Sequence, residues 1–150
     1  MKLTSSAFSG NSPIPVKYTC KGADLSPALN WTDPPAGTKS FALIMDDPDA
    51  PMGTWVHWVI YDIPPSATML GEGITREKDL PGGGTQGIND FRKIGYGGPC
   101  PPSGTHRYFF KLYALDAMLA LKPGITKDQL LTATRGHILG EAQLMGAYRR

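Results

Sequence analysis

Glycine and proline divide this chain into short apolar segments. The sequence contains 18 glycines and 14 prolines among 150 residues, and they fall between the apolar runs without a repeat period. Tight turns favour both residues, because glycine accepts positive φ angles and proline presets its own φ. This distribution is typical of many short strands joined by turns, and it argues against a collagen-like or disordered tract.

Three segments have the pattern of strands, and one has the pattern of a helix. Residues 40–45 form a continuous apolar run that predicts a fully buried strand. Residues 55–63 and 106–115 are rich in aromatic and β-branched residues. A capping box over Thr126–Gln129 predicts the start of a helix. Apolar positions at helical spacing extend this predicted helix through Leu131, Thr134, Ile138, Ala142 and Met145. One helix among many strands predicts a mainly β fold, a sandwich or barrel with a helical appendage.

Length and charge restrict the function classes. A chain of 150 residues corresponds to one domain, so we expect residues 1–150 to fold as a unit. The net charge is +2 with scattered basic residues, which gives no phosphate-tracking stripe for nucleic acid. No apolar run has the length of a signal peptide or a membrane span. We therefore expect a cytoplasmic protein with no nucleic-acid partner and no membrane span.

Two cysteines, Cys20 and Cys100, lie 80 positions apart. No Cys-x-x-Cys spacing is present, so a zinc site built on cysteine is not expected, and no other cofactor is indicated. Free cysteines are among the most buried residues, so we expect two small buried thiols. A disulfide is the alternative, which a cytosolic mesophile disfavours and a hyperthermophile does not.

Polar side chains with useful chemistry lie at the boundaries of the predicted strands. They are Asp47, Asp49, His57, His106 and Tyr108. His106 and Tyr108 share a face of their strand, because alternate residues point the same way. Two imidazoles, a phenol and glycine-rich backbone suit a small phosphate-like anion. The aspartates would then orient the imidazoles and raise the histidine pKa values, and each aspartate must itself be partnered.

Other interpretations use the same residues. Two carboxylates and two imidazoles have the composition of a metal site, although no spacing fixes two ligands on one element. Ser103 or Cys100 near His106 would suit covalent catalysis, but neither lies in a nucleophile elbow. A purely structural role is the third alternative, because Asp-Pro-Asp-Ala-Pro is ordinary turn composition.

The motifs in these segments resemble the phosphatidylethanolamine-binding protein family, also called the Raf kinase inhibitor-like family. The resemblance is greatest to its short bacterial and archaeal branch. It is carried by Asp47-Pro-Asp-Ala-Pro51, by residues 55–64, and by the loop from Gly95 to Tyr108. Residues 18–22, 25–31 and 144–148 are also similar to this branch.

The resemblance implies an antiparallel Greek-key β-sandwich with short helices and a C-terminal helix. It also implies a ligand cavity for anionic groups such as phosphorylated head groups. Matched by motif, the cavity residues are Asp47, Asp49, His57, Gly98, Pro99, His106 and Tyr108.

The function expected from these observations is non-enzymatic binding of a small phosphate-like anion, with no catalytic residue, no metal and no cofactor. Family members include inhibitors of kinases and of serine proteases, so regulation of such a partner is a further expectation, and a homodimer is left open. The alternatives are a metal-dependent or other hydrolase using the same pocket, and a protein-interaction inhibitor that uses an exposed loop such as 82–95.

Overall fold

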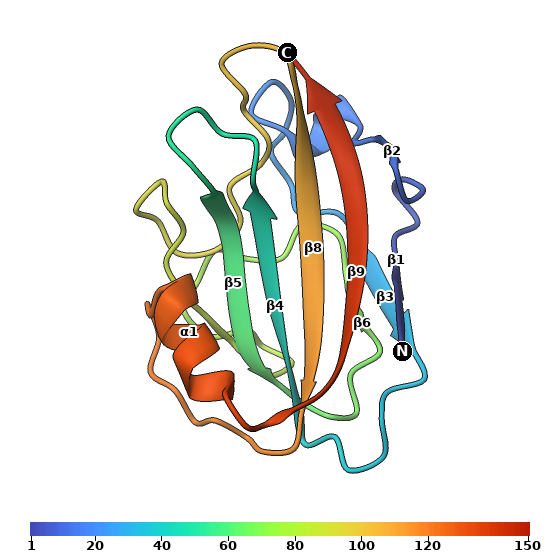
Figure 1. Ribbon diagram of the computed structural model, residues 1–150, viewed down its shortest axis with the longest axis vertical. Helices are drawn as coiled ribbons and strands as arrows, with labels where there is room; N and C mark the ends of the chain where they lie inside the picture. Colours follow the sequence, from blue (N-terminus) through green and yellow to red (C-terminus); the bar gives the residue numbers. More distant parts are fainter.

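Two β-sheets packed face to face form the protein (Figure 1). In this computed structural model, which covers residues 1–150, the larger sheet has the strand order β2-β9-β8-β4-β5-β7 and the smaller has the order β1-β3-β6. The elements in chain order are β1 (Lys2–Thr4), β2 (Ser12–Pro13), a 3-10 helix (Val16–Tyr18), β3 (Leu29–Thr32), β4 (Ser40–Asp47), β5 (Trp55–Ile63), β6 (Met69–Leu70), β7 (Thr85–Gln86), β8 (Thr105–Leu115), α1 (Lys127–Thr134) and β9 (Ile138–Arg149).

Strand β4 is central to the larger sheet, because it pairs in antiparallel fashion with both β5 and β8. Strands β4, β5 and β7 are successive neighbours, and β8 then returns to the other side of β4. This order is that of a Greek key, so the predicted mainly β Greek-key sandwich is confirmed. The expectation of a wholly antiparallel arrangement is wrong in one place. After β1, the chain runs along the edge of β9 in the same direction as β9. Strand β2 therefore pairs with β9 in parallel.

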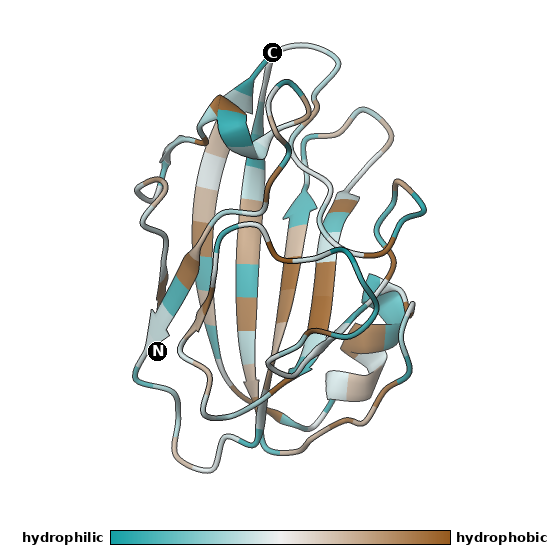
Figure 2. Ribbon diagram, turned by 180° about the vertical axis from the view of Figure 1, so that it is seen from behind, coloured by the Kyte–Doolittle hydropathy of each residue, from teal (hydrophilic) through white to brown (hydrophobic).

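The central strands are apolar because they are buried on both faces. Phe41, Leu43 and Met45 of β4 point into the main core of 19 buried residues between the sheets. Ala42 and Ile44 point to the opposite face, where they pack in a second cluster with Leu130 of α1. The predicted fully buried strand is thus confirmed. Hydrophobic bands along the central strands are visible from behind in Figure 2.

The predicted C-terminal helix is correct at its start and wrong in its extent. The capping box forms, with the Thr126 side chain accepting from the Gln129 amide, but the helix ends at Thr134. Arg135 leaves the helical region with ψ 128°, and Gly136 has φ +77°. The chain then reverses into β9, which pairs along the whole length of β8. Backbone pairing with an open strand edge outweighed a helical pattern that two glycines had already weakened.

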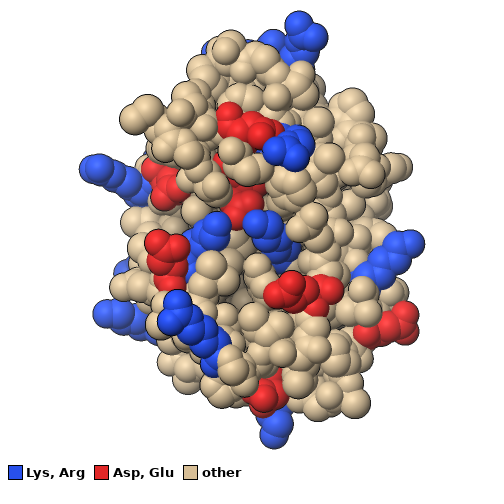
Figure 3. All heavy atoms as spheres, viewed as in Figure 1, with Lys and Arg blue, Asp and Glu red and all other residues tan.

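Charges on the outer face of the larger sheet are interspersed rather than grouped by sign, as Figure 3 shows. Asp46 is 1% exposed, and its Oδ2 lies 3.2 Å from Lys111 Nζ and 2.8 Å from Lys127 Nζ. These ion pairs connect the start of α1 to β4 and β8. The only α-helix is eight residues long, and no helix has the length and apolar character needed to cross a bilayer.

Candidate ligand pocket

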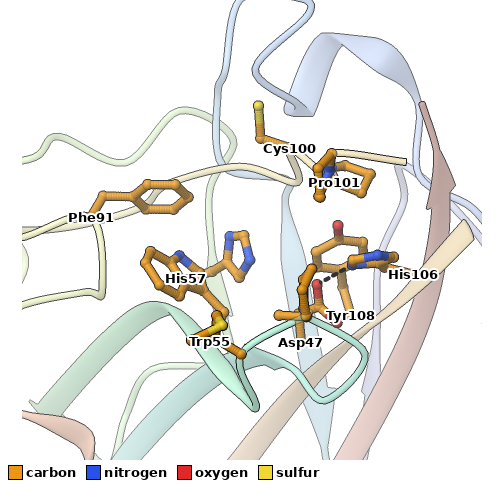
Figure 4. A pocket seen from close by; sticks show the side chains of 12 residues that line it. Asp47, Trp55, His57, Phe91, Cys100, Pro101, His106 and Tyr108 are labelled. Carbon is orange, nitrogen blue, oxygen red and sulfur yellow. Dashed lines mark hydrogen bonds and ion pairs between the residues drawn. The ribbon is translucent and has the colours of Figure 1, made fainter. Parts of the chain in front are cut away.

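A cavity lies at the end of the larger sheet where β4 ends and β5 and β8 begin. Antiparallel pairing brings these ends together, because Asp47 lies opposite Trp55 and Asp46 lies opposite Phe109. The cavity has a volume of about 230 Å³. Figure 4 shows the side chains that surround it. The lining residues are Asp47, Ala50, Pro51, Met52, Trp55, His57, Phe91, Cys100, Pro101, Pro102, His106 and Tyr108.

Asp47 and His106 form a buried pair in the wall of this cavity. His106 Nδ1 lies 2.7 Å from Asp47 Oδ2, and the two side chains are 9% and 4% exposed. The other carboxylate oxygen of Asp47 accepts from the backbone amide of Asp49 at 2.7 Å. A carboxylate can only accept, so Nδ1 of His106 carries a hydrogen and Nε2 is the nitrogen left for a ligand. The expected role of an aspartate that orients an imidazole is observed here.

His57 is held by a backbone carbonyl rather than by an aspartate. Its Nδ1 lies 2.6 Å from the carbonyl oxygen of Gly97, whose amide donates back to the His57 carbonyl at 2.9 Å. Burial lowers the pKa of His57, although the Gly97 carbonyl and the charge of Asp47 oppose the change. The expectation of a raised histidine pKa is therefore wrong for His57, because desolvation of the charged ring outweighs the opposing contributions.

Tyr108 lies between the two imidazoles. Its ring centroid is 5.2 Å from that of His57 with the planes at 82°, and 6.5 Å from that of His106 with the planes at 23°. Burial and then the charge of Asp47 raise the pKa of Tyr108. The phenol therefore remains protonated at neutral pH, and its hydroxyl can donate to an anion.

Asp49 does not line the cavity but holds the loop that does. Its carboxylate accepts from Nε, Nη2 and the backbone amide of Arg107, each at 2.9 Å. The hydrogen bond from Arg107 lowers the pKa of Asp49 to about 2. Both aspartates are thus partnered, as anion binding requires, although only Asp47 faces the cavity.

Gly98 and Pro99 also lie outside the lining. The Gly98 amide donates to Asp24 Oδ1 at 2.8 Å, and the Pro99 carbonyl accepts from the Cys20 amide at 3.1 Å. A side chain at position 98 would collide with Asp24 and with the backbone of Tyr18. The glycine is therefore required by close packing of two loops, and its amide is already used within the protein.

Cys20 and Cys100 form a disulfide, with their Cα atoms 5.4 Å apart. The expectation of two buried free thiols is wrong. Cys20 is exposed and Cys100 is only partly buried, so neither occupies the core position that favours a free thiol. The bond joins the 95–104 loop to the segment after the 3-10 helix, and Cys100 also lines the cavity.

Trp55 and Phe91 form an apolar wall of the cavity that was not among the predicted site residues. Trp55 precedes His57 by two positions on β5, so strand alternation already placed both on one face. Phe91 arrives from an irregular loop, and its ring packs edge-on against Trp55 at 5.5 Å and His57 at 5.3 Å. No sequence pattern indicates that contact. Trp55 Nε1 is buried and has no hydrogen-bond partner in the protein.

The cavity contains no arginine or lysine, and its ionisable side chains are Asp47, His57, His106 and Tyr108. No three histidine, cysteine, aspartate or glutamate side chains lie close enough together to hold a metal ion. The arrangement offers a phenol donor, an imidazole nitrogen on each histidine, and one partnered carboxylate. Such a set can bind a small oxyanion by hydrogen bonds, with charge supplied when an imidazole is protonated.

Comparison with known proteins identifies the family. Residues 4–149 match the family model described as phosphatidylethanolamine-binding protein. A UPF0098 protein of Methanothermobacter thermautotrophicus is 54% identical over 150 residues, covering 100% of this chain and 99% of that protein. A UPF0098 protein of Aquifex aeolicus is 49% identical, covering 100% and 89%.

Solved structures agree with this assignment. The phosphatidylethanolamine-binding protein homologue CT736 of Chlamydia trachomatis superposes with a TM-score of 0.92 at 45% identity, covering 99% of this chain and 97% of that one. YbcL of E. coli, described as a new member of the mammalian family, gives a TM-score of 0.92 at 32% identity, covering 99% and 98%. The chain therefore belongs to the phosphatidylethanolamine-binding protein family, in its bacterial and archaeal branch.

Proposed function

We propose that this protein binds a small phosphate-like anion, or a phosphorylated head group, in the Asp47–His106 cavity and does not turn it over. The observation that carries the proposal is the buried 2.7 Å contact between His106 Nδ1 and Asp47 Oδ2. This contact leaves His106 Nε2 for a ligand. Protonation at that atom gives a charge-assisted donor beside the Tyr108 hydroxyl.

Further donors support an anionic ligand. Cys100 is the only residue of the run Pro99-Cys-Pro-Pro102 that has a backbone N–H, and this N–H donates to no acceptor in the protein. Trp55 Nε1 is a second donor without a protein partner. Both residues line the cavity. The Cys100 N–H adds a loop donor to those on β8, whereas Trp55 Nε1 is enclosed by protein atoms.

Binding without turnover is favoured by the state of the side chains that would act as nucleophiles. The sulfur of Cys100 is held in the disulfide, so it is not a thiolate. Ser103 is exposed and does not line the cavity. The remaining lining groups are donors, acceptors and apolar surface, which suit recognition.

The test is calorimetric titration with inorganic phosphate and with phosphoethanolamine. We expect the wild type to bind and His106→Ala to bind about ten- to a hundredfold more weakly, because a hydrogen bond to a charged group is lost. His137→Ala is the matched control, since His137 Nδ1 also lies 2.7 Å from a carboxylate, that of Asp116, but in an exposed pair remote from the cavity. Absence of binding in the wild type, or equal binding by both variants, would contradict the proposal.

Turnover is measured separately with p-nitrophenyl phosphate, with and without a chelator. We expect no release of p-nitrophenol above the rate in buffer. Release of p-nitrophenol that disappears in His106→Ala but persists in His137→Ala would show that the cavity catalyses hydrolysis, and it would contradict binding without turnover.

A further inference from the structure

The two histidines of the cavity present different atoms to a ligand, and this difference limits which anion fits. A backbone carbonyl can only accept, so the 2.6 Å contact with Gly97 places a hydrogen on His57 Nδ1. His57 is 3% exposed, and both this bond and the return bond from the Gly97 amide fix its ring. In the neutral ring, Nε2 therefore has no hydrogen and acts as an acceptor.

The surroundings of His57 favour that neutral ring. Phe91 and Tyr108 pack edge-on against it, with ring centroids at 5.3 Å and 5.2 Å. Asp47 on β4 and Asp90 in the loop after β7 are the carboxylates that face it, and each already accepts other hydrogen bonds. Asp47 accepts from His106 and from the Asp49 amide, and Asp90 accepts from the Val56 amide at 2.7 Å. Burial lowers the pKa of His57 accordingly.

We propose that the cavity selects an oxyanion that still carries an ionisable proton, such as a phosphomonoester monoanion, over a fully deprotonated oxyanion such as sulfate. His57 Nε2 is the atom that accepts a hydrogen bond from this P–OH group. The inference rests on the proposed anion-binding function. It assigns an acceptor to one side of the ligand, His57 Nε2, and donors to the other, Tyr108 and His106.

Charge favours the same selection. No arginine or lysine lines the cavity to compensate a dianion, and Asp47 is part of the wall. A sulfate oxygen placed against His57 Nε2 brings two lone pairs together beside a side chain that is 3% exposed. A P–OH group at the same place makes a hydrogen bond. A buried polar group left unpaired lowers the affinity by about fivefold to a hundredfold.

The experiment compares methyl phosphate with sulfate by calorimetry, and the readout is the ratio of their affinities as a function of pH. Sulfate does not titrate in this range, so its own affinity reports only changes in the protein. The second pKa of a phosphomonoester is about 6. At about pH 5 we expect wild type to prefer methyl phosphate at least tenfold, and we expect this preference to decline as pH rises above about 6.

His57→Phe tests the assigned atom, because it keeps a ring against Phe91 and Tyr108 but removes the acceptor. We expect the ratio to fall at least threefold in this variant, because the acceptor for the P–OH group and its repulsion of sulfate are both removed. The part of the preference that comes from the charge of the cavity remains. A thermal melt establishes that the variant is folded. His137→Ala, remote from the cavity, should keep the wild-type ratio.

The outcomes separate the two proposals. Equal binding of methyl phosphate and sulfate by the wild type, or an undiminished preference in His57→Phe, overturns the selection and leaves anion binding in place. If wild type binds neither anion at any pH tested, the proposed function fails and the selection fails with it.

Discussion

His106 and Asp47 form a pair with the same 2.7 Å nitrogen–oxygen separation as His137 and Asp116, yet the two pairs differ in burial. The side chains of the first pair are 9% and 4% exposed, and those of the second are both 44% exposed. The protein thus contains its own comparison between a buried and an exposed imidazole–carboxylate contact.

The first prediction uses this comparison. Asp47→Ala leaves the His106 Nδ1 hydrogen buried without an acceptor, so we expect it to lower the free energy of unfolding by about 1–3 kcal/mol. In Asp116→Ala, water can replace the carboxylate as the partner of His137, so we expect the free energy of unfolding to fall by less than about 1 kcal/mol. Urea denaturation at neutral pH measures both. Equal losses in the two variants would show that burial of the first pair has no energetic consequence.

The second prediction concerns pH. The pKa of His57 is lowered in the folded protein, so at mildly acidic pH the unfolded chain binds a proton at this residue that the folded chain does not. The stability associated with neutral His57 is present above its unfolded pKa of about 6.5 and declines as pH falls below that value. We expect His57→Phe to flatten the stability curve between about pH 5 and 7 relative to wild type. A slope identical to that of the wild type would argue that His57 titrates normally.

Strand positions were predictable because they depend on local pattern. The run at 40–45, the aromatic segment at 55–63 and the segment at 106–115 became β4, β5 and β8 within two residues at each end. The convergence of Asp47, His57, His106 and Tyr108 was a hypothesis from the sequence. It depends on the register of three strands, and that register follows from non-local pairing rather than from any one segment.

Other features were decided by contacts that a sequence does not display. Asp47 and Asp49 are two positions apart and have the same chemistry, but the Asp49 amide bonds to Asp47 and its carboxylate turns to Arg107. Residues from Ile138 onward have apolar residues at helical spacing, but they form strand β9 because their backbone pairs with the edge of β8. The disulfide joins residues 80 apart, a separation for which no spacing rule exists.

The third prediction addresses the buried carboxylate beneath α1. Asp46 is compensated by Lys111 and Lys127, whose side chains are 32% and 21% exposed. Replacing both lysines with methionine leaves a buried charge without a cation, and we expect a loss of about 3–5 kcal/mol in the free energy of unfolding. Adding Asp46→Asn to that double variant removes the charge itself and should restore more than half of the loss.

Chemical denaturation of the single, double and triple variants completes the cycle for Asp46. The decisive comparison is between the double and the triple variant. A triple variant no more stable than the double variant would mean that packing, and not charge, accounts for the effect of the lysines.

The fourth prediction separates stability from binding at the disulfide. Cross-linking residues 80 apart restricts the unfolded chain, so Cys20→Ala/Cys100→Ala should lower the free energy of unfolding by about 2–4 kcal/mol. The loop keeps two other anchors, because Tyr96 donates its hydroxyl hydrogen to the Tyr18 carbonyl at 2.7 Å and Gly98 bonds to Asp24.

These anchors hold the Gly97 carbonyl against His57 without the disulfide, so phosphate affinity should change less than about threefold in the double variant. Urea denaturation gives the stability, and calorimetry well below the unfolding transition gives the affinity. Loss of binding in a folded double variant would show that the covalent bond, rather than the hydrogen bonds of the loop, positions the cavity wall. An unchanged stability would show that the unfolded chain gains little freedom when the bond is absent.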